Sequence, residues 1–144
     1  MERREFLKSG CNGCAALAAF GVAALFLESC AAPSRIFKVE SVNGQLHIPL
    51  DRFSTDTSLV VRTNELPYDL LVVKKSDTVF ISLAMQCTHR QQPLVVTSGG
   101  LVCNEHGSRF NFDGDVTMDP ATRPLARLET EVRQNEVVVF TERN

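Results

Sequence analysis

Four side chains able to bind a metal ion lie in two short segments of this 144-residue chain. The first segment contains Cys87 and His89, and the second, which thirteen residues separate from the first, contains Cys103 and His106. Each segment offers one thiolate and one imidazole, which are donors that zinc and iron sites in proteins use. A hairpin that includes the predicted strand Leu94–Thr97 can bring the segments together. The spacing therefore predicts one site built from two loops.

Two other interpretations of these four residues stay open at this point. Two cysteines and two histidines can hold a structural zinc ion, although zinc modules usually space paired cysteines by about two to four residues. Alternatively, Cys87 and Cys103 can form a disulfide beside two ordinary surface histidines. The chain has three histidines, and two of them occupy these positions, which makes coincidence a poor explanation.

The two segments resemble the ligand motif of the Rieske family of [2Fe–2S] proteins, which is Cys-x-His, a spacer and then Cys-x-x-His. The spacer here is somewhat shorter than is common. The loop around Pro120 resembles the loop that covers the cluster in that family. The resemblance runs from Cys87 to about Leu128. After the second histidine it continues, in the order found in Rieske proteins of cytochrome bc complexes, through Gly107-Ser108-Arg109-Phe110, Asp113-Gly114-Asp115-Val116 and Pro120 to Leu125.

The resemblance implies a single [2Fe–2S] cluster held by four residues. By position, Cys87 and Cys103 bind the iron that stays ferric. His89 and His106 bind the iron that takes up the electron. The two histidines are then expected at the surface, where they form the exit for electrons toward a redox partner.

Two features depart from the high-potential members of that family. A disulfide joins the ligand loops in many Rieske proteins of cytochrome bc complexes, but its two positions are Gln92 and Glu105 here. Ser108 matches a serine that donates to a cluster sulfide, whereas Phe110 replaces a tyrosine that donates to a ligand thiolate. Hydrogen bonds to sulfur raise the potential, because they stabilise the more negative reduced cluster. We therefore expect a potential in the lower or middle part of the Rieske range of roughly −150 to +300 mV.

The chain from Arg35 onward has the pattern of an all-β protein. Short apolar runs alternate with turn residues, as in an antiparallel β-sandwich or barrel. Asn43-Gly44 predicts a tight hairpin turn, because that pair tolerates positive φ. The resemblance adds a small cluster-binding subdomain of two loops. The predicted strands are Ile36–Val42, Gln45–Ile48, Ser58–Thr63, Leu70–Lys74, Thr78–Leu83, Leu94–Thr97, Leu101–Cys103, Arg109–Phe112, Ala126–Arg133 and Glu136–Thr141.

Residues 1–30 have the pattern of a targeting segment, and residues 35–144 are the predicted Rieske domain. The stretch from Arg3 to Lys8 is similar to the twin-arginine export motif, although Glu2 departs from its first position. The apolar core that follows has 13 residues, which is typical of a signal peptide and short for a membrane span. Cys30 is a candidate for lipidation in a lipoprotein cleavage box. An uncleaved N-terminal membrane anchor is the alternative.

The net charge and the number of histidines argue against two classes of function. The formal net charge is -2, which argues against a nucleic-acid partner. A Rieske oxygenase needs a second iron site with two further histidines, and only His47 remains. The resemblance instead implies an exported electron-transfer protein, periplasmic or on the outer face of a bacterial membrane, with a cytochrome or an oxidoreductase subunit as partner. The alternative is a small subunit of a quinol-oxidising or arsenite-oxidase-like complex.

Overall fold

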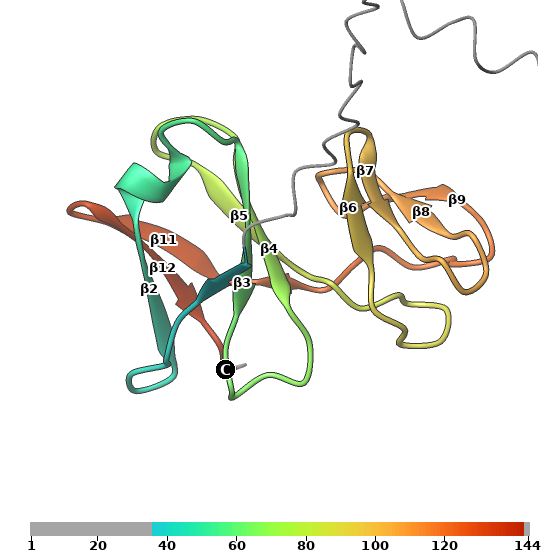
Figure 1. Ribbon diagram of the computed structural model, residues 1–144, viewed down its shortest axis with the longest axis horizontal. Helices are drawn as coiled ribbons and strands as arrows, with labels where there is room; N and C mark the ends of the chain where they lie inside the picture. Colours follow the sequence, from blue (N-terminus) through green and yellow to red (C-terminus); the bar gives the residue numbers. More distant parts are fainter. Residues whose placement is uncertain (1–35, 143–144) are drawn as a thin grey trace, which may run out of the picture. The chain divides into compact units, whose positions relative to one another are not determined.

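The computed structural model describes residues 36–142, and β-strands dominate this range (Figure 1). One short 3-10 helix within it, η1, spans Leu50–Phe53. The strands are β1 (Ile36–Lys38), β2 (Gln45–Pro49), β3 (Ser58–Arg62), β4 (Leu70–Lys74), β5 (Phe80–Ala84), β6 (Val95–Thr97), β7 (Gly100–Val102), β8 (Arg109–Phe110), β9 (Val116–Met118), β10 (Arg127–Leu128), β11 (Thr130–Arg133) and β12 (Glu136–Phe140).

Strand β4 shows how the chain builds two hydrophobic cores. Successive side chains of a strand point to opposite faces of the sheet. Leu70, Leu71, Val72 and Val73 are nevertheless all buried. Leu70 and Val72 belong to one core, whereas Leu71 and Val73 belong to the other. The sheet that contains β4 is therefore covered on both faces, which explains its continuous apolar sequence.

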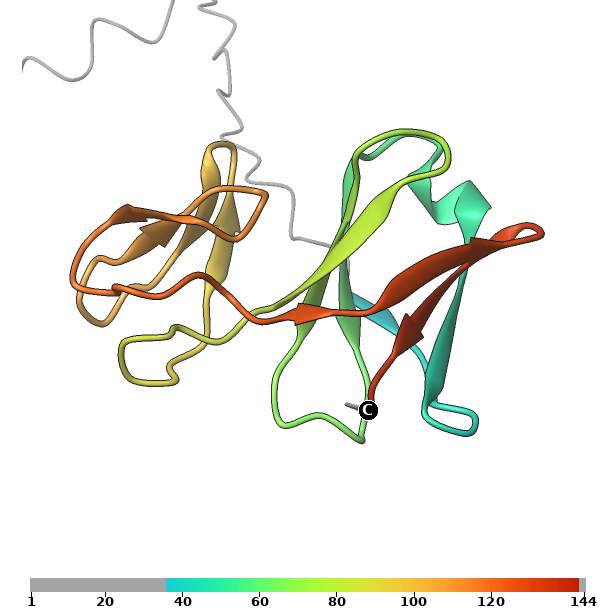
Figure 2. The ribbon, with the colours of Figure 1, turned by 180° about the vertical axis from the view of Figure 1, so that it is seen from behind.

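One core joins two sheets, which together we call the base (Figures 1 and 2). The first sheet has five strands in the order β1-β3-β4-β5-β10, and the second has three in the order β11-β12-β2. Inside this core the rings of Phe53 and Phe80 meet edge to face, with centroids 4.9 Å apart. The buried members are Leu46, Ile48, Phe53, Val61, Leu70, Val72, Phe80, Val137 and Val139.

Residues 85–126 form an insertion between β5 and β10, which we call the inserted subdomain (Figure 2). Because β10 pairs with β5, the chain leaves the base and returns to it on neighbouring strands. The subdomain contains a four-stranded sheet in the order β6-β7-β8-β9. Its inward row consists of Val96, Leu101, Phe110 and Val116, which lie opposite one another across the strands and pack into the second core.

The structure corrects two predicted strands. Ala126–Arg133 is not one strand, because β10 joins the five-stranded sheet and β11 joins the three-stranded sheet. The chain thus crosses from one sheet to the other between these strands. The predicted strand Ile36–Val42 ends at Lys38. β1 pairs with β3 in parallel, which is the one parallel pairing among the described strands and departs from the expected antiparallel arrangement.

Strand β9 is an element that the sequence did not predict. Its three residues lie between Gly114 and Pro120 and are too few to show alternation. The predicted turn at Asn43-Gly44 is confirmed, with φ values of 53° and 71°. Val42 and Gln45 exchange two backbone hydrogen bonds of 2.9 and 3.0 Å around it.

Within residues 36–142, no helix has the length and apolar character needed to cross a membrane. The predicted targeting segment, with the twin-arginine-like stretch and Cys30, lies outside the described residues.

Candidate metal centre

The two predicted ligand segments fold into loops with the same backbone hydrogen bonds. In residues 87–92, the first ligand loop, Cys87 N–H donates to the Gln92 carbonyl (2.8 Å) and Gln91 N–H donates to the Cys87 carbonyl (2.7 Å). Residues 103–108, the second ligand loop, repeat this pattern. There Cys103 N–H donates to the Ser108 carbonyl (2.9 Å) and Gly107 N–H donates to the Cys103 carbonyl (2.9 Å). Each loop therefore begins at a cysteine and is closed five residues later.

Both loops need a left-handed residue at their fifth position. Gly107 fills it in the second loop with φ of 83°, a conformation that glycine adopts at little cost. Gln91 fills it in the first loop with φ of 58°, which is unusual for a residue with a side chain. Strands β6 and β7 form the hairpin that connects the loops, as the sequence predicted.

The thiols lie inside the protein and the imidazoles lie outside. Cys87 and Cys103 are each 1% exposed and belong to the same hydrophobic core. Both are free thiols, so the alternative of a disulfide between them is wrong. His89 and His106 are exposed, and their ring centroids are 4.9 Å apart in an edge-to-face arrangement. The fold thus brings all four predicted residues to one end of the inserted subdomain.

The surroundings of Cys87 favour the thiolate, which is the form that binds metal. Burial raises the pKa of the Cys87 thiol. The opposite effect comes from four hydrogen bonds, donated by the backbone of His89 and Arg90 and by the side chains of Cys103 and Ser108. These bonds outweigh burial and hold the pKa of Cys87 below its ordinary value.

The proline-containing loop of residues 119–125, which we call the proline loop, is tied to both ligand loops. Ser108 is fully buried, and its hydroxyl accepts a hydrogen bond of 3.0 Å from the backbone N–H of Ala121. On the other side, the Thr88 hydroxyl donates to the Arg123 carbonyl at 2.6 Å. These contacts join the loops where a disulfide is absent from the sequence. The sequence alone gave no signal for the part played by Thr88.

The remaining predicted residues lie around this centre. Phe110 is 1% exposed on β8 and presents an apolar ring to the core, whereas Pro120 is exposed on the proline loop. Gly107 is also exposed, and its role is the left-handed turn. Close packing constrains the sheet beneath, because a Cβ on Gly100 would collide with the Phe110 carbonyl oxygen.

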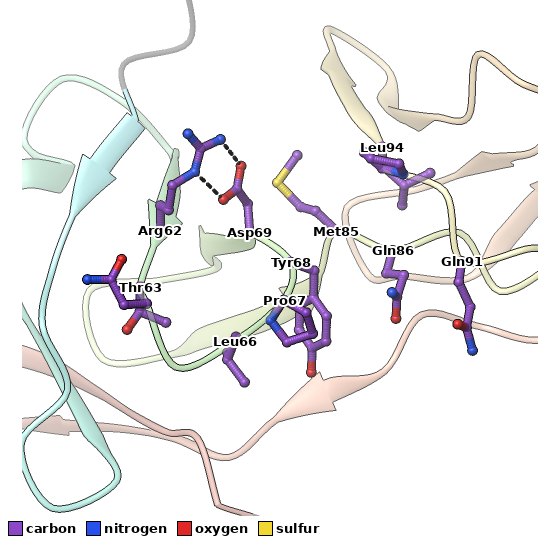
Figure 3. A pocket seen from close by; sticks show the side chains of 12 residues that line it. Arg62, Thr63, Leu66, Pro67, Tyr68, Asp69, Met85, Gln86, Gln91 and Leu94 are labelled. Carbon is purple, nitrogen blue, oxygen red and sulfur yellow. Dashed lines mark hydrogen bonds and ion pairs between the residues drawn. The ribbon is translucent and has the colours of Figure 1, made fainter.

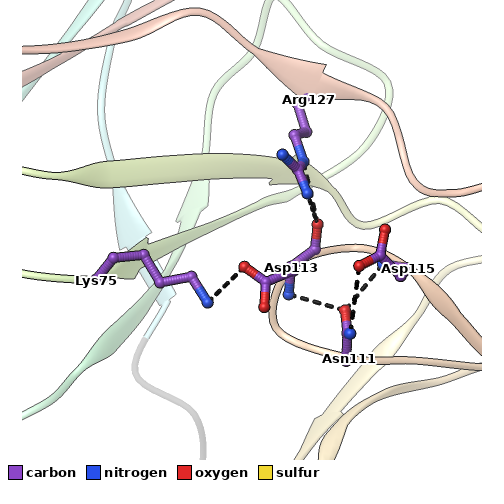
Figure 4. A network of polar contacts seen from close by, with 5 residues as sticks. All are labelled: Lys75, Asn111, Asp113, Asp115 and Arg127. Atoms are coloured by element: carbon purple, nitrogen blue, oxygen red, sulfur yellow. Dashed lines mark hydrogen bonds and ion pairs between the residues drawn. The ribbon is translucent and has the colours of Figure 1, made fainter.

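A polar network fixes the turn between β8 and β9 against the base (Figure 4). The Asn111 side-chain oxygen accepts hydrogen bonds of 2.9 Å from the backbone of Asp113 and from that of Asp115. The Asp113 carboxylate pairs with Lys75 of the base at 2.6 Å. The backbone carbonyl of Asp113 accepts a hydrogen bond of 3.1 Å from Arg127 Nε. The network therefore links the sheet that carries the second ligand loop to two segments of the base.

The donor set fits a cluster of two irons. A [2Fe–2S] cluster of the Rieske type needs only two donors per iron, sulfur on one side and nitrogen on the other. An inner pair of thiols and an outer pair of imidazoles meets that requirement.

Comparisons with known proteins agree with this donor set. The family model of the Rieske [2Fe-2S] domain matches residues 47–141, which is well over half of the chain. The chain therefore belongs to the Rieske family. It carries a single [2Fe–2S] cluster and is an electron-transfer iron–sulfur protein. No curated protein matches the chain in sequence.

Two solved structures have a similar fold. The cyanobacterial plasma membrane Rieske protein PetC3 from Synechocystis is 24% identical with a TM-score of 0.55, and the match covers 65% of this chain and 96% of that one. A chain from the complex of reduced oxygenase and oxidised ferredoxin in carbazole 1,9a-dioxygenase is 26% identical with a TM-score of 0.55. That match covers 72% of this chain and 98% of the other. The all-β Rieske fold is thus confirmed.

Proposed function

We propose that Cys87, His89, Cys103 and His106 bind the cluster, with both thiolates on one iron and both imidazoles on the other. The observation that carries this assignment is the pair of buried free thiols beneath two adjacent exposed imidazoles. The cluster, when bound, supplies one-electron redox chemistry. The protein residues hold it, exclude water from the sulfur side and leave the imidazole side open to a partner.

The surrounding hydrogen bonds stabilise negative charge at the sulfur of Cys87. Backbone N–H groups of the first ligand loop and the Ser108 hydroxyl donate to it. Donors of this kind favour the more negative, reduced state and so raise the potential. Phe110 cannot donate in this way, and we propose a potential in the lower or middle part of the family range for that reason.

We further propose that the protein is exported and passes single electrons between protein partners outside the cytoplasm. The twin-arginine-like stretch within residues 1–30 supports this, because that route carries proteins that have already folded around a cofactor. Cys30 either bears a lipid or follows a retained anchor, so that the domain is held at the membrane surface. A cytochrome or an oxidoreductase subunit is the proposed partner.

Anaerobic purification followed by iron and sulfide assays tests the ligand assignment. We expect two irons and two labile sulfides per chain, and a reduced-state EPR spectrum with the low average g value of Rieske clusters. His89→Ala and His106→Ala should each abolish that signal. The matched control is His47→Ala, because His47 lies on β2 and pairs with Glu136 at 3.0 Å, away from the ligand loops. A cluster that needs His47, or that survives both other changes, contradicts the assignment.

Cell fractionation tests the proposed location. Replacing Arg3 and Arg4 together with lysine should leave the protein in the cytoplasm, because the twin-arginine route requires the arginine pair. Cys30→Ser should release the exported protein from the membrane if Cys30 bears a lipid. Membrane retention of the Cys30→Ser protein would instead support the uncleaved anchor.

A further inference from the structure

Two adjoining surface pockets form a groove along the first ligand loop. The first has a volume of about 380 Å³ and runs from Arg62 and Asp69 to Gln91 and Leu94 (Figure 3). The second has a volume of about 320 Å³ and reaches Cys87, Thr88 and Arg123. The two pockets share Tyr68, Gln86 and Gln91. The groove therefore follows the wall of the metal centre on the side of Cys87, beside the loop that exposes His89.

The backbone of Gln91 has a conformation that is unfavourable for a residue with a side chain. Its φ of 58° is one that glycine adopts freely, and the matching position of the second loop is Gly107. The loop does not need the glutamine side chain to hold its shape, because the bonds that close it come from the backbone. Strain at an exposed functional loop suggests that the side chain itself has a use. Here Gln91 lines both pockets.

The charge beside the first ligand loop is positive, whereas Glu65 lies between Asn64 and Leu66, which line the first pocket alone. Arg62 and Asp69 neutralise each other through two hydrogen bonds of 2.7 Å. Arg90 on the first ligand loop and Arg123 in the groove wall are exposed, and neither has an acidic partner among residues 36–142. This local excess of cations contrasts with the net charge of -2 for the whole chain. A surface of this kind attracts an acidic partner during encounter.

We propose that this groove is the docking site for an acidic segment of a redox partner protein. Gln91 and Gln86 would hydrogen-bond to the partner's backbone or side chains, and Arg90 and Arg123 would attract and orient it. The partner then sits beside His89 and contacts the Arg123 end of the proline loop. The proposal rests on the proposed electron-transfer function and adds to it the location and chemistry of the partner surface.

Stopped-flow oxidation of the reduced, cluster-loaded protein tests the proposal with two protein acceptors of opposite charge. The acidic acceptor is plastocyanin, and the basic one is cytochrome c. We expect plastocyanin to react severalfold faster, with a rate that falls as salt rises. Arg90→Gln and Arg123→Gln should each lower the plastocyanin rate roughly three- to tenfold. Arg52→Gln is the matched control, because Arg52 lies on η1 over the Phe37 ring and should not change the rate.

Variants of Gln91 separate docking from folding. Gln91→Ala and Gln91→Gly should lower the plastocyanin rate by similar factors, and Gln91→Asn should restore part of it. Gln91→Gly should keep or raise the melting temperature, because it relieves the left-handed backbone. Film voltammetry measures the reduction potential of each variant, and the docking effect is the part of the rate change that remains after the change in driving force is subtracted.

Other outcomes overturn the proposal without touching the proposed function. Equal rates with both acceptors, or unchanged rates in the Arg90, Arg123 and Gln91 variants, would show that the groove is not a docking site. A change in sedimentation on substituting Gln91 would show that a second copy of the chain occupies it. A protein that lacks reversible redox chemistry at an electrode would instead refute the proposed function itself.

Discussion

The base and the inserted subdomain both bury apolar side chains, but the inserted subdomain relies in addition on polar contacts between its loops. The base buries long apolar side chains between two sheets, and several of them are fully inaccessible. Strands β6 to β9 of the subdomain have only two or three residues each. Its buried side chains, among them Leu94, Leu101 and Phe110, share a core with the base. Hydrogen bonds at Ser108 and Thr88 and the network around Asp113 also join its loops to one another and to the base. The comparison teaches that burial of apolar side chains holds both regions, while the metal-binding end depends in addition on polar contacts and on its cluster.

Loss of an iron ligand should disorder the inserted subdomain and leave the base folded, which is the largest difference we expect between the two regions. Cys87→Ala removes a proposed iron ligand, and we expect no bound cluster at all. The base should stay folded, because its core lies on the other face of the five-stranded sheet. Hydrogen exchange should then show fast exchange in residues 85–126 and slow exchange in β3, β4 and β12. Met85→Leu is the control, since Met85 is buried in the same core but donates to no metal. Retention of the cluster would contradict the ligand assignment.

Two neighbouring glycines in the β6–β7 hairpin, Gly99 and Gly100, test how closely the inserted subdomain is packed. Gly100→Ala should destabilise the protein by roughly 3 kcal/mol, because its φ is 134° and its Cβ would collide with the Phe110 carbonyl. Gly99→Ala should change stability by less than about 0.5 kcal/mol, since nothing lies within 4 Å of its Cβ. Thermal unfolding of the two variants checks this difference. Equal effects would mean that the hairpin is not closely packed on β8.

Hydrogen bonding to sulfur gives a smaller effect that leaves the fold intact. Ser108→Ala removes a donor to Cys87 and should lower the reduction potential by about 60 mV, if the bond favours the reduced state by about 1.4 kcal/mol. Phe110→Tyr should raise the potential if its hydroxyl reaches a ligand sulfur. Film voltammetry measures both shifts. Thr130→Ala is the control, because its hydroxyl bonds to Ser82 in the base. An unchanged reduction potential in Ser108→Ala would show that the Ser108 hydroxyl does not tune the cluster.

The smallest effect should come from the ion pair between the two regions. Asp113→Asn breaks the contact with Lys75, and both side chains are partly exposed at 50% and 33%. We expect a loss of about 0.5–1 kcal/mol in unfolding free energy. The loss should shrink in high salt, because ions screen exposed charges. Denaturant titrations at low and high salt check this. If the loss of unfolding free energy is the same at both salt concentrations, it comes from the backbone contacts of Asp113 and not from the ion pair.

The sequence predicted much of the metal-binding end because its chemistry is local. Two cysteines and two histidines at fixed spacing identified both loops, and Asn43-Gly44 identified a turn. What it missed depends on partners distant in the chain. The division of Ala126–Arg133 follows from pairing with β5 and β12, which no short pattern records. The hydrogen bond from Thr88 to the Arg123 carbonyl likewise joins residues far apart in sequence.

Nitrogen coupling in the reduced protein tests the central proposal most directly. Protein grown with ¹⁵N-labelled histidine in an otherwise unlabelled background should show, by pulsed EPR of the reduced cluster, two histidine nitrogens coupled to the unpaired electron. His47→Ala should leave both couplings in place. A cluster signal with no histidine coupling, or with a coupling that disappears in His47→Ala, would contradict ligation by His89 and His106.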